Sequence, residues 1–408
     1  MIYDKTISLV VATLLSFTLA ACSDTENRGD QASQLVEQGM APASGPLTKR
    51  TPTADEQKYV DFRTQPNSAF EALLTDPPVV IDGQTLHPKL QWEYEKDKKE
   101  PEKDRRASLI KTMNDEAAKN RLRGIVDIYW DITTKETPPM AAVYDMAIEG
   151  PDHTSLPIRI YVPDVDTGEE KLPVLVYYHG GGYLFGSIQA LDGAVRLIAT
   201  EAKVIAVSVD YRLAPENPYP AFSLDAQAAF NWTVDNIAEY GGDPNNVSVG
   251  GDSAGGFLSV STTIRQLESG GQVPAAHLLY YPALDKNYED YPSYDLFKKG
   301  FGLDEGFMLA ATEMAFQNVD ANDPLISMNK YAHMDKMPPS IIASAGFDPI
   351  RDHGKVFAEK VTSAGGGAVD YKNYPSLTHG FLEASGTIDD AEEACLETAR
   401  KFGELVRR

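Results

Sequence analysis

The sequence is poor in cysteine and in positive charge, and both shortages exclude classes of protein. Two cysteines, Cys22 and Cys395, occur in 408 residues, so a framework of disulfide bonds is not expected. Lysine and arginine number 37 against 60 aspartate and glutamate residues, which gives a formal net charge of −23. Nucleic-acid-binding proteins usually carry a basic surface, so no nucleic-acid partner is expected.

The chain also lacks the local patterns of several cofactor sites. Its glycine run at 180–182 does not end in Gly-Lys-Ser/Thr, as a phosphate-binding loop does, and does not follow Gly-x-Gly-x-x-Gly. No group of His, Cys, Asp and Glu has metal-ligand spacing along the sequence, and no internal repeat is visible. We therefore expect no cofactor and no metal.

The one long apolar run, residues 7–21, is shorter than the roughly 20 residues of a membrane-spanning helix. A basic residue before it and small residues at its end predict an export signal, residues 1–21. Its last residues, Leu19-Ala20-Ala21-Cys22, resemble the lipobox of bacterial lipoproteins, which implies lipidation at Cys22. Ser23 implies sorting to the outer membrane in a Gram-negative cell. An ordinary cleaved signal, giving a periplasmic or secreted protein, and an uncleaved anchor are the alternatives.

Residues 22–53 are rich in polar residues, glycine and proline, and they predict a flexible tether before a globular part at 54–408. A run of mixed charges at 93–106 is expected to lie in solvent. Apolar runs at 156–162, 172–178, 204–209, 247–250, 277–281 and 340–345 alternate with helical patterns, which predicts an α/β fold with a mostly parallel sheet and helices on both faces. Two stretches, about 54–132 and 284–329, do not fit this alternation and are expected to lie outside the sheet, and the second is expected to cover the site.

Gly251-Asp252-Ser253-Ala254-Gly255 lies between a predicted strand and a predicted helix. A serine at such a tight turn is presented as a nucleophile, and glycines on either side avoid a collision across the turn. The serine needs a base, and His379 follows the final predicted strand in a loop. His87, His153 and His353 suit surface or helix-cap positions instead.

Two carboxylates could orient the histidine. Asp348 follows an apolar run directly, whereas Asp352 lies at the start of the next helix, where capping or pairing with Arg351 is expected. We therefore assign Asp348. Gly180, Gly181 and Gly182 follow His179 at the end of another strand, so their backbone N–H groups can face an oxyanion.

Together these motifs, with Asp210-Tyr211-Arg212-Leu213-Ala214-Pro215-Glu216, resemble the hormone-sensitive-lipase-like bacterial esterases of the α/β-hydrolase fold. The resemblance covers about residues 81–408. It implies a helical cap from 54–132 and 284–329, an oxyanion hole formed by Gly181, Gly182 and Ala254, and a structural role for His179. Gly180, Gly251, Asp252 and Gly255 complete the supporting motifs.

The expected function is that of a serine carboxylesterase, with Ser253, Asp348 and His379 as its triad and short-to-medium acyl esters as substrates. A deacetylase or amidase with the same triad is the alternative. A non-catalytic binding module of this fold is less favoured, because all three triad residues are present. The oligomeric state stays open.

Overall fold

The computed structural model describes residues 51–98, 104–136, 139–166, 168 and 170–407. The predicted signal peptide 1–21, the lipidation site Cys22 and most of the predicted tether 22–53 therefore lie outside the described residues. Within the described part of the chain, no helix is both long and apolar enough to cross a membrane.

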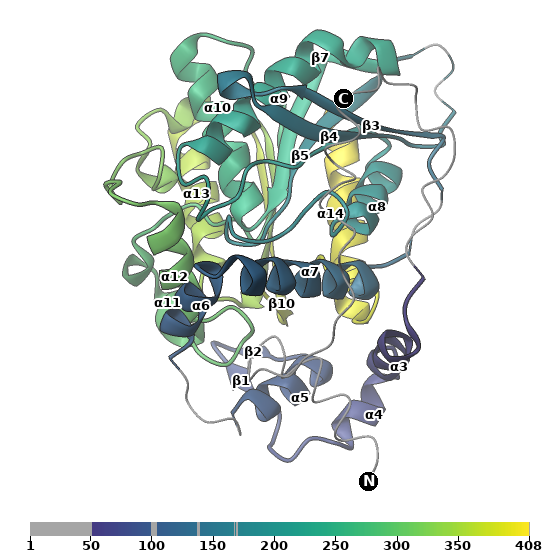
Figure 1. The fold of residues 1–408 in the computed structure, drawn as a ribbon, viewed down its shortest axis with the longest axis vertical. Coiled ribbons are helices and arrows are strands. Elements are labelled where there is room, and N and C mark those ends of the chain that lie inside the picture. Colours follow the sequence, from purple (N-terminus) through teal and green to yellow (C-terminus); the bar gives the residue numbers. More distant parts are fainter. Residues whose placement is uncertain (1–50, 99–103, 137–138, 167, 169, 408) are drawn as a thin grey trace.

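An eight-stranded sheet forms the centre of the molecule (Figure 1). Its strands are β3 (Ala142–Glu149), β4 (Ser155–Val162), β5 (Leu172–Tyr178), β6 (Ile205–Val209), β7 (Gly242–Asp252), β8 (His277–Tyr280), β9 (Ser340–Phe347) and β10 (Val369–Thr378). They lie in the order β10-β9-β8-β7-β5-β6-β4-β3. Neighbours from β10 to β6 are parallel, and β4 is antiparallel to both β6 and β3. The expected mostly parallel sheet is confirmed.

Different helices cover the two faces of the sheet. Helices α8 (Asp192–Ala202) and α14 (Asp389–Val406) pack on one face, and α9 (Ala221–Asn236), α10 (Ala254–Ser269) and α13 (Arg351–Ala364) pack on the other. Strand β5 is buried along its whole length. Val174 and Val176 belong to the core beneath α9 and α10, whereas Leu175 and Tyr177 belong to the core beneath α8 and α14. Burial on both faces explains its continuous apolar sequence.

The two stretches outside the alternation supply the remaining elements. The first contains α3 (Ala54–Arg63), α4 (Asn67–Glu71), β1 (Val80–Ile81), β2 (Gln84–Thr85), α5 (Pro88–Asp97), α6 (Arg105–Met113) and α7 (Glu116–Thr133). The second contains α11 (Pro292–Phe297) and α12 (Glu305–Ala315). Short 3-10 turns occupy Pro151–His153, Ile237–Tyr240, Tyr288–Asp290, Met328–Lys330 and Met334–Lys336. Helices α6 and α12 pack against each other, so the two stretches meet in space (Figure 1).

The mixed charges at 93–106 behave in two ways. The side chains of Lys98 and Arg106 are at least half exposed, as expected. Glu93 and Arg105 are only partly exposed: Glu93 pairs at 2.7 Å with the fully buried Arg63, and Arg105 pairs with both Asp97 and Asp304. Asp304 caps α12, so Arg105 links the two stretches by charge.

Candidate active site

Ser253 lies at the turn between β7 and α10 in a backbone conformation that only a tightly packed turn can hold. Its φ is +52° and its ψ is −113°, a strained combination for a residue with a side chain. The turn is fixed by hydrogen bonds to the neighbouring strand and its loop: the Ser253 N–H donates to the Tyr280 carbonyl (2.9 Å), and its own carbonyl accepts from the Ala283 N–H (3.0 Å). These hydrogen bonds to the neighbouring strand fix the position of the serine.

Gly251 and Gly255 let this turn press against the end of β5. A Cβ atom at Gly255 would lie 1.8 Å from the carbonyl oxygen of Tyr178, and one at Gly251 would lie 2.2 Å from the same oxygen. Both distances are far below van der Waals contact. The sequence argument that glycines avoid a collision here therefore has a specific cause, the backbone of the adjacent strand.

The structure brings Ser253, His379 and Asp348 into one hydrogen-bonded chain, although each comes from a different strand end. His379 follows β10, and its Nε2 lies 2.9 Å from Ser253 Oγ. Asp348 follows β9, and its Oδ2 lies 2.8 Å from His379 Nδ1. Asp348 is fully buried, and its other oxygen accepts from the Ile350 N–H (2.9 Å). With Nδ1–H donating to Asp348, Nε2 is free to accept the serine proton.

Asp352, the other carboxylate considered, is occupied elsewhere. It pairs with Arg351 at 2.9 Å and accepts a hydrogen bond from the Ser293 N–H (3.0 Å). Of the histidines expected at surface or cap positions, His87 caps α5 and His153 is exposed. The expectation was wrong for His353, which is completely buried in α13 beside Tyr291.

The glycine loop after β5 presents free backbone donors near the serine. Gly181 and Gly182 have φ values of +106° and +62°, and among the described residues neither N–H group has a hydrogen-bond acceptor. A Cβ at Gly181 would lie 2.3 Å from the Phe185 carbonyl, and one at Gly182 would lie 2.8 Å from the ring of Phe307 on α12. Only glycine fits either position, and α12 covers the loop through Phe307.

His179 supports this loop from behind. Its buried ring stacks on that of Tyr211 at 4.2 Å, and its Nδ1–H donates to the Gly180 carbonyl (2.8 Å). The Tyr211 hydroxyl donates to the His179 carbonyl (2.6 Å). Burial lowers the pKa of His179 to about 4, so the ring is neutral at physiological pH. These contacts fit the structural role that the resemblance implies.

Asp252 supports the loop from the other side. Its Oδ1 accepts from the Gly180 N–H (2.9 Å) and from the Tyr177 hydroxyl (2.7 Å). A Cβ at Gly180 would lie 2.1 Å from Asp252 Oδ2, so this glycine is also packed too tightly for a side chain.

One contact residue was missed by the sequence reasoning. Arg123 of α7 donates to the carbonyls of Leu184 and Ala214, both at 2.9 Å, and forms a two-pronged ion pair with Glu216. The glycine loop is therefore bonded to the helical cap. Glu216 ends the Asp210–Glu216 motif, which was the available signal that a cationic partner exists.

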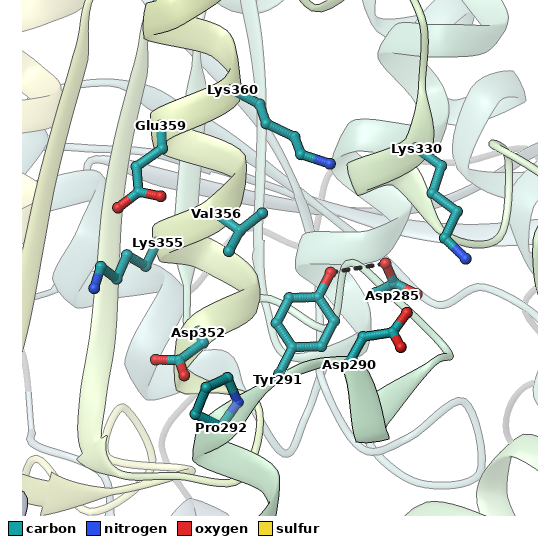
Figure 2. Close-up of a pocket in the computed structure, with 10 residues that line it drawn as sticks. All are labelled: Asp285, Asp290, Tyr291, Pro292, Lys330, Asp352, Lys355, Val356, Glu359 and Lys360. Carbon is teal, nitrogen blue, oxygen red and sulfur yellow. Dashed lines mark hydrogen bonds between the residues drawn. The ribbon is translucent and has the colours of Figure 1, made fainter.

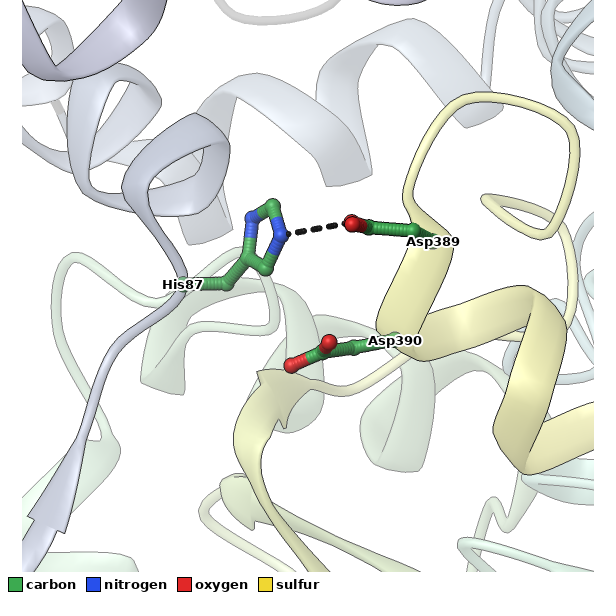
Figure 3. Close-up of side chains that lie close together, drawn as sticks. All are labelled: His87, Asp389 and Asp390. Carbon is green, nitrogen blue, oxygen red and sulfur yellow. Dashed lines mark hydrogen bonds and ion pairs between the residues drawn. The ribbon is translucent and has the colours of Figure 1, made fainter. Parts of the chain in front are cut away.

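One group of potentially metal-ligating side chains includes none of the triad residues. His87, Asp389 and Asp390 bring potential ligand atoms within 4.8 Å of one another at the start of α14 (Figure 3). His87 Nδ1 accepts from the Lys89 N–H (3.2 Å), so its Nε2 carries the proton and donates to Asp389 at 2.9 Å. That tautomer has no lone pair on Nε2 for a metal. The hydrogen bond between His87 and Asp389 instead joins the start of α5 to the start of α14.

A surface cavity of about 360 Å³ lies beside α11 and α13 (Figure 2). The Tyr291 hydroxyl donates to Asp285 there (2.7 Å), and Asp352, Lys355, Glu359 and Lys360 of α13 also line the cavity. None of Ser253, His379 and Asp348 lines this cavity. Its mixed charge indicates no particular ligand.

The glycine contacts lead to a test. Gly255→Ala should lower kcat/KM for an ester about a hundredfold or more, because the Cβ must displace the turn and with it the serine. Gly124→Ala is the matched control, since a Cβ there meets nothing within 4 Å and alanine favours a helix. Circular dichroism should show both variants folded. Unchanged activity of Gly255→Ala would contradict the close contact.

Comparisons with known proteins identify the fold and the family of the chain. Residues 175–383 match the family model described as alpha/beta hydrolase fold. Carboxylesterase NlhH of Mycobacterium tuberculosis is 35% identical over 72% of this chain and 89% of its own length. Ethyl acetate hydrolase of Pseudomonas putida is 31% identical over 62% of this chain and 79% of its own length.

Solved structures give the same result. An ester hydrolase from the metagenome of Lake Arreo superimposes with a TM-score of 0.67 at 31% identity, covering 74% of this chain and 98% of that one. A thermophilic carboxylesterase from a metagenomic library superimposes with a TM-score of 0.66 at 29% identity, covering 71% and 98%. The chain therefore belongs to the α/β-hydrolase fold family, in its hormone-sensitive-lipase-like group of esterases.

Proposed function

We propose that the protein is a serine carboxylesterase that hydrolyses short-to-medium acyl esters through an acyl-enzyme on Ser253. The observation that carries the proposal is the hydrogen-bonded chain from Ser253 Oγ through His379 to the buried Asp348. A serine hydroxyl becomes a useful nucleophile only when a base lies within hydrogen-bond distance and a third group orients that base. Both conditions are met by this arrangement.

In the first half-reaction His379 Nε2 takes the proton of Ser253 as Oγ attacks the ester carbonyl carbon. The carbonyl oxygen becomes an oxyanion, which accepts hydrogen bonds from the N–H groups of Gly181, Gly182 and Ala254. Each such donor stabilises the transition state by about 3 kcal/mol. Asp348 holds the His379 ring in place and stabilises its positive charge. His379 then protonates the leaving alcohol, and the acyl group stays on Ser253.

In the second half-reaction a water molecule takes the place of the alcohol. His379 removes a proton from the water, whose oxygen attacks the acyl carbon, and the same N–H groups hold the second oxyanion. Collapse of this intermediate returns the proton to Ser253 and releases the carboxylic acid. No cofactor is required for either step.

The part of α12 that covers the glycine loop favours small acyl groups. Phe307 of α12 contacts Gly182 closely, and its ring also lies 6.1 Å from that of Phe185 in the loop. Aromatic rings this near the oxyanion donors leave limited room above the scissile carbonyl. The relative named ethyl acetate hydrolase is also named for a short acyl ester.

The triad itself is open to a direct test. Ser253→Ala should lower kcat for p-nitrophenyl butyrate by at least about a thousandfold, because the nucleophile is lost. Ser269→Ala, at the exposed end of the same helix, is the matched control and should keep full activity. Retained activity in Ser253→Ala, or labelling of that variant by an organophosphate probe, would exclude Ser253 as the nucleophile.

The choice between ester and amide or acetyl substrates is tested with wild-type protein. We expect kcat/KM to peak at short-to-medium p-nitrophenyl esters and to fall for long acyl chains, which would collide with Phe307 and Phe185. The p-nitroanilide of butyric acid should react at least about a hundredfold more slowly than the ester, because its leaving group is poorer. Preference for the anilide or for an acetylated sugar would favour the alternative function.

We propose in addition that the protein is exported and anchored to a bacterial membrane through a lipid on Cys22. Support comes from the sequence alone: the apolar run at 7–21, the lipobox-like Leu19-Ala20-Ala21-Cys22 and the polar stretch that follows. Stable anchoring by lipid requires more than one acyl chain, which a diacylated cysteine supplies.

Metabolic labelling checks the anchor. A bacterial host given radioactive palmitate should label the wild-type protein and leave Cys22→Ser unlabelled, with the variant moving from the membrane to the soluble fraction. Cys395→Ser is the control, because Cys395 is buried in α14 and should not affect labelling. Equal labelling of Cys22→Ser would rule out lipidation at this site.

A further inference from the structure

We propose that Asp252 and Glu383 share one proton and that this acid pair holds the glycine loop in a fixed position relative to the loop that carries His379. Both are positioning residues, and their effect on catalysis rests on the proposed esterase function. The resemblance assigned Asp252 only as a motif residue, and nothing in the sequence analysis singled out Glu383.

Asp252 is almost fully buried at the end of β7, with 1% of its surface exposed. Its Oδ1 receives the Gly180 N–H and the Tyr177 hydroxyl. Its Oδ2 is also buried, but among the described residues no N–H or hydroxyl group donates to it. A buried carboxylate oxygen without a donor is costly, so the charge on this group needs an explanation.

Glu383 comes from the other side of the site, four residues after His379. It is 5% exposed, and its Oε2 accepts from the Tyr281 hydroxyl (2.8 Å). The ring of Tyr281 lies 4.7 Å from the His379 ring, so Glu383 is connected to the base through one aromatic side chain. Gly380, the residue after the histidine, has a φ of +80° and borders Glu383 Oε2.

The side chains of Asp252 and Glu383 lie close enough to each other for a hydrogen bond, which would satisfy the buried Oδ2 of Asp252. Two carboxylates have no donor between them, so this bond requires a proton on one of the four oxygens. Burial, and then the neighbouring Glu383, raise the pKa of Asp252 well above its usual range. The proton belongs on Asp252 Oδ2, which is the oxygen that lacks another donor.

No positive charge is available to replace the proton. Among the described residues, neither carboxylate forms an ion pair with lysine or arginine. The other titratable groups that interact with the pair are Tyr177 of β5, Tyr211, Tyr280, Tyr281, Tyr129 of α7 and Cys395 of α14. Burial raises the pKa of each of them, so all stay neutral at physiological pH. His179, which stacks on Tyr211, is neutral as well.

The shared proton gives Asp252 the hydrogen-bonding pattern of an amide. Its carbonyl-like Oδ1 accepts from Gly180 and Tyr177, and its protonated Oδ2 donates to Glu383. The pair, with a single negative charge, then connects the glycine loop, the turn at Ser253 and the loop that carries His379. Loss of the proton would place a second negative charge beside the oxyanion site and break the bond between the loops.

The sign of a pH effect on stability distinguishes this arrangement from an ordinary ionised acceptor. The unfolded chain releases the Asp252 proton at about pH 4, while the folded protein keeps it, so stability falls as the pH rises above that value. An ionised Asp252 held by donors would have a lowered pKa and would gain stability over the same rise in pH.

Asp252→Asn is the decisive variant, because asparagine reproduces the protonated acid. Between about pH 5 and about pH 7, the unfolding constant of wild type relative to Asp252→Asn should rise about tenfold per pH unit, one proton's worth. Urea titrations at each pH measure both unfolding constants and do not depend on an activity assay. Glu404→Gln, an exposed acid on α14, is the control and should show no such trend. A ratio that falls with pH overturns the proposal.

Activity provides the second readout. Asp252→Leu should lower kcat about a hundredfold or more, because the loops lose their link, whereas Asp252→Asn should restore kcat to within about fivefold of wild type at pH 7. Equal losses in the two variants would mean that the charge of Asp252, rather than a neutral link, is what the loop requires, and would overturn the proposal.

Two further measurements keep the test decisive if Asp252→Asn fails to fold. Glu383→Gln removes the negative charge beside Asp252 but leaves it buried, so the pH trend in stability should keep its sign and extend over a narrower pH range. Infrared spectra of wild-type protein at pH 8 should show the carbonyl band of a buried protonated carboxyl group, and its absence would overturn the proposal. An inactive wild type that still shows the band and the trend would refute the esterase function alone.

Discussion

The contact of the serine turn with the end of strand β5 is the constraint on which the site depends. The Tyr178 carbonyl lies where a Cβ of Gly251 or Gly255 would be, so the turn can reach its position only with glycine on both sides. The same carbonyl immediately precedes His179 and the glycine loop. One close approach therefore fixes the strained φ of Ser253 and also its distance from the oxyanion donors.

Around this contact the fold brings separate strand ends together. Parallel strands end at the same edge of a sheet, so the groups that follow β5, β7, β9 and β10 converge, although they span about half of the sequence. The cap then holds the glycine loop in place: Arg123 bonds it to α7, and Phe307 packs on it from α12. Rigid backbone donors and a covered site are what oxyanion stabilisation requires.

The sequence was informative where a constraint is local. Gly181, Gly182, Gly251 and Gly255 stand where backbone geometry permits no side chain, and the continuous apolar runs of β5 and β9 stand where both faces are buried. Strand β3 escaped prediction because it lies at the sheet edge, with only two of its eight residues buried. His353 was misplaced because its burial depends on Tyr291, about sixty residues away.

The sequence by itself determined the fold class, the family and the order of serine, acid and histidine, because these follow from periodicity and from motifs a few residues long. The tertiary structure decided the pairings. Arg105 bridges two cap segments, Arg123 holds the glycine loop, and Glu383 meets Asp252 from 131 positions away. Such pairings depend on which side chains are buried together without water, and burial of that kind is a property of the packed molecule, not of any segment of the chain.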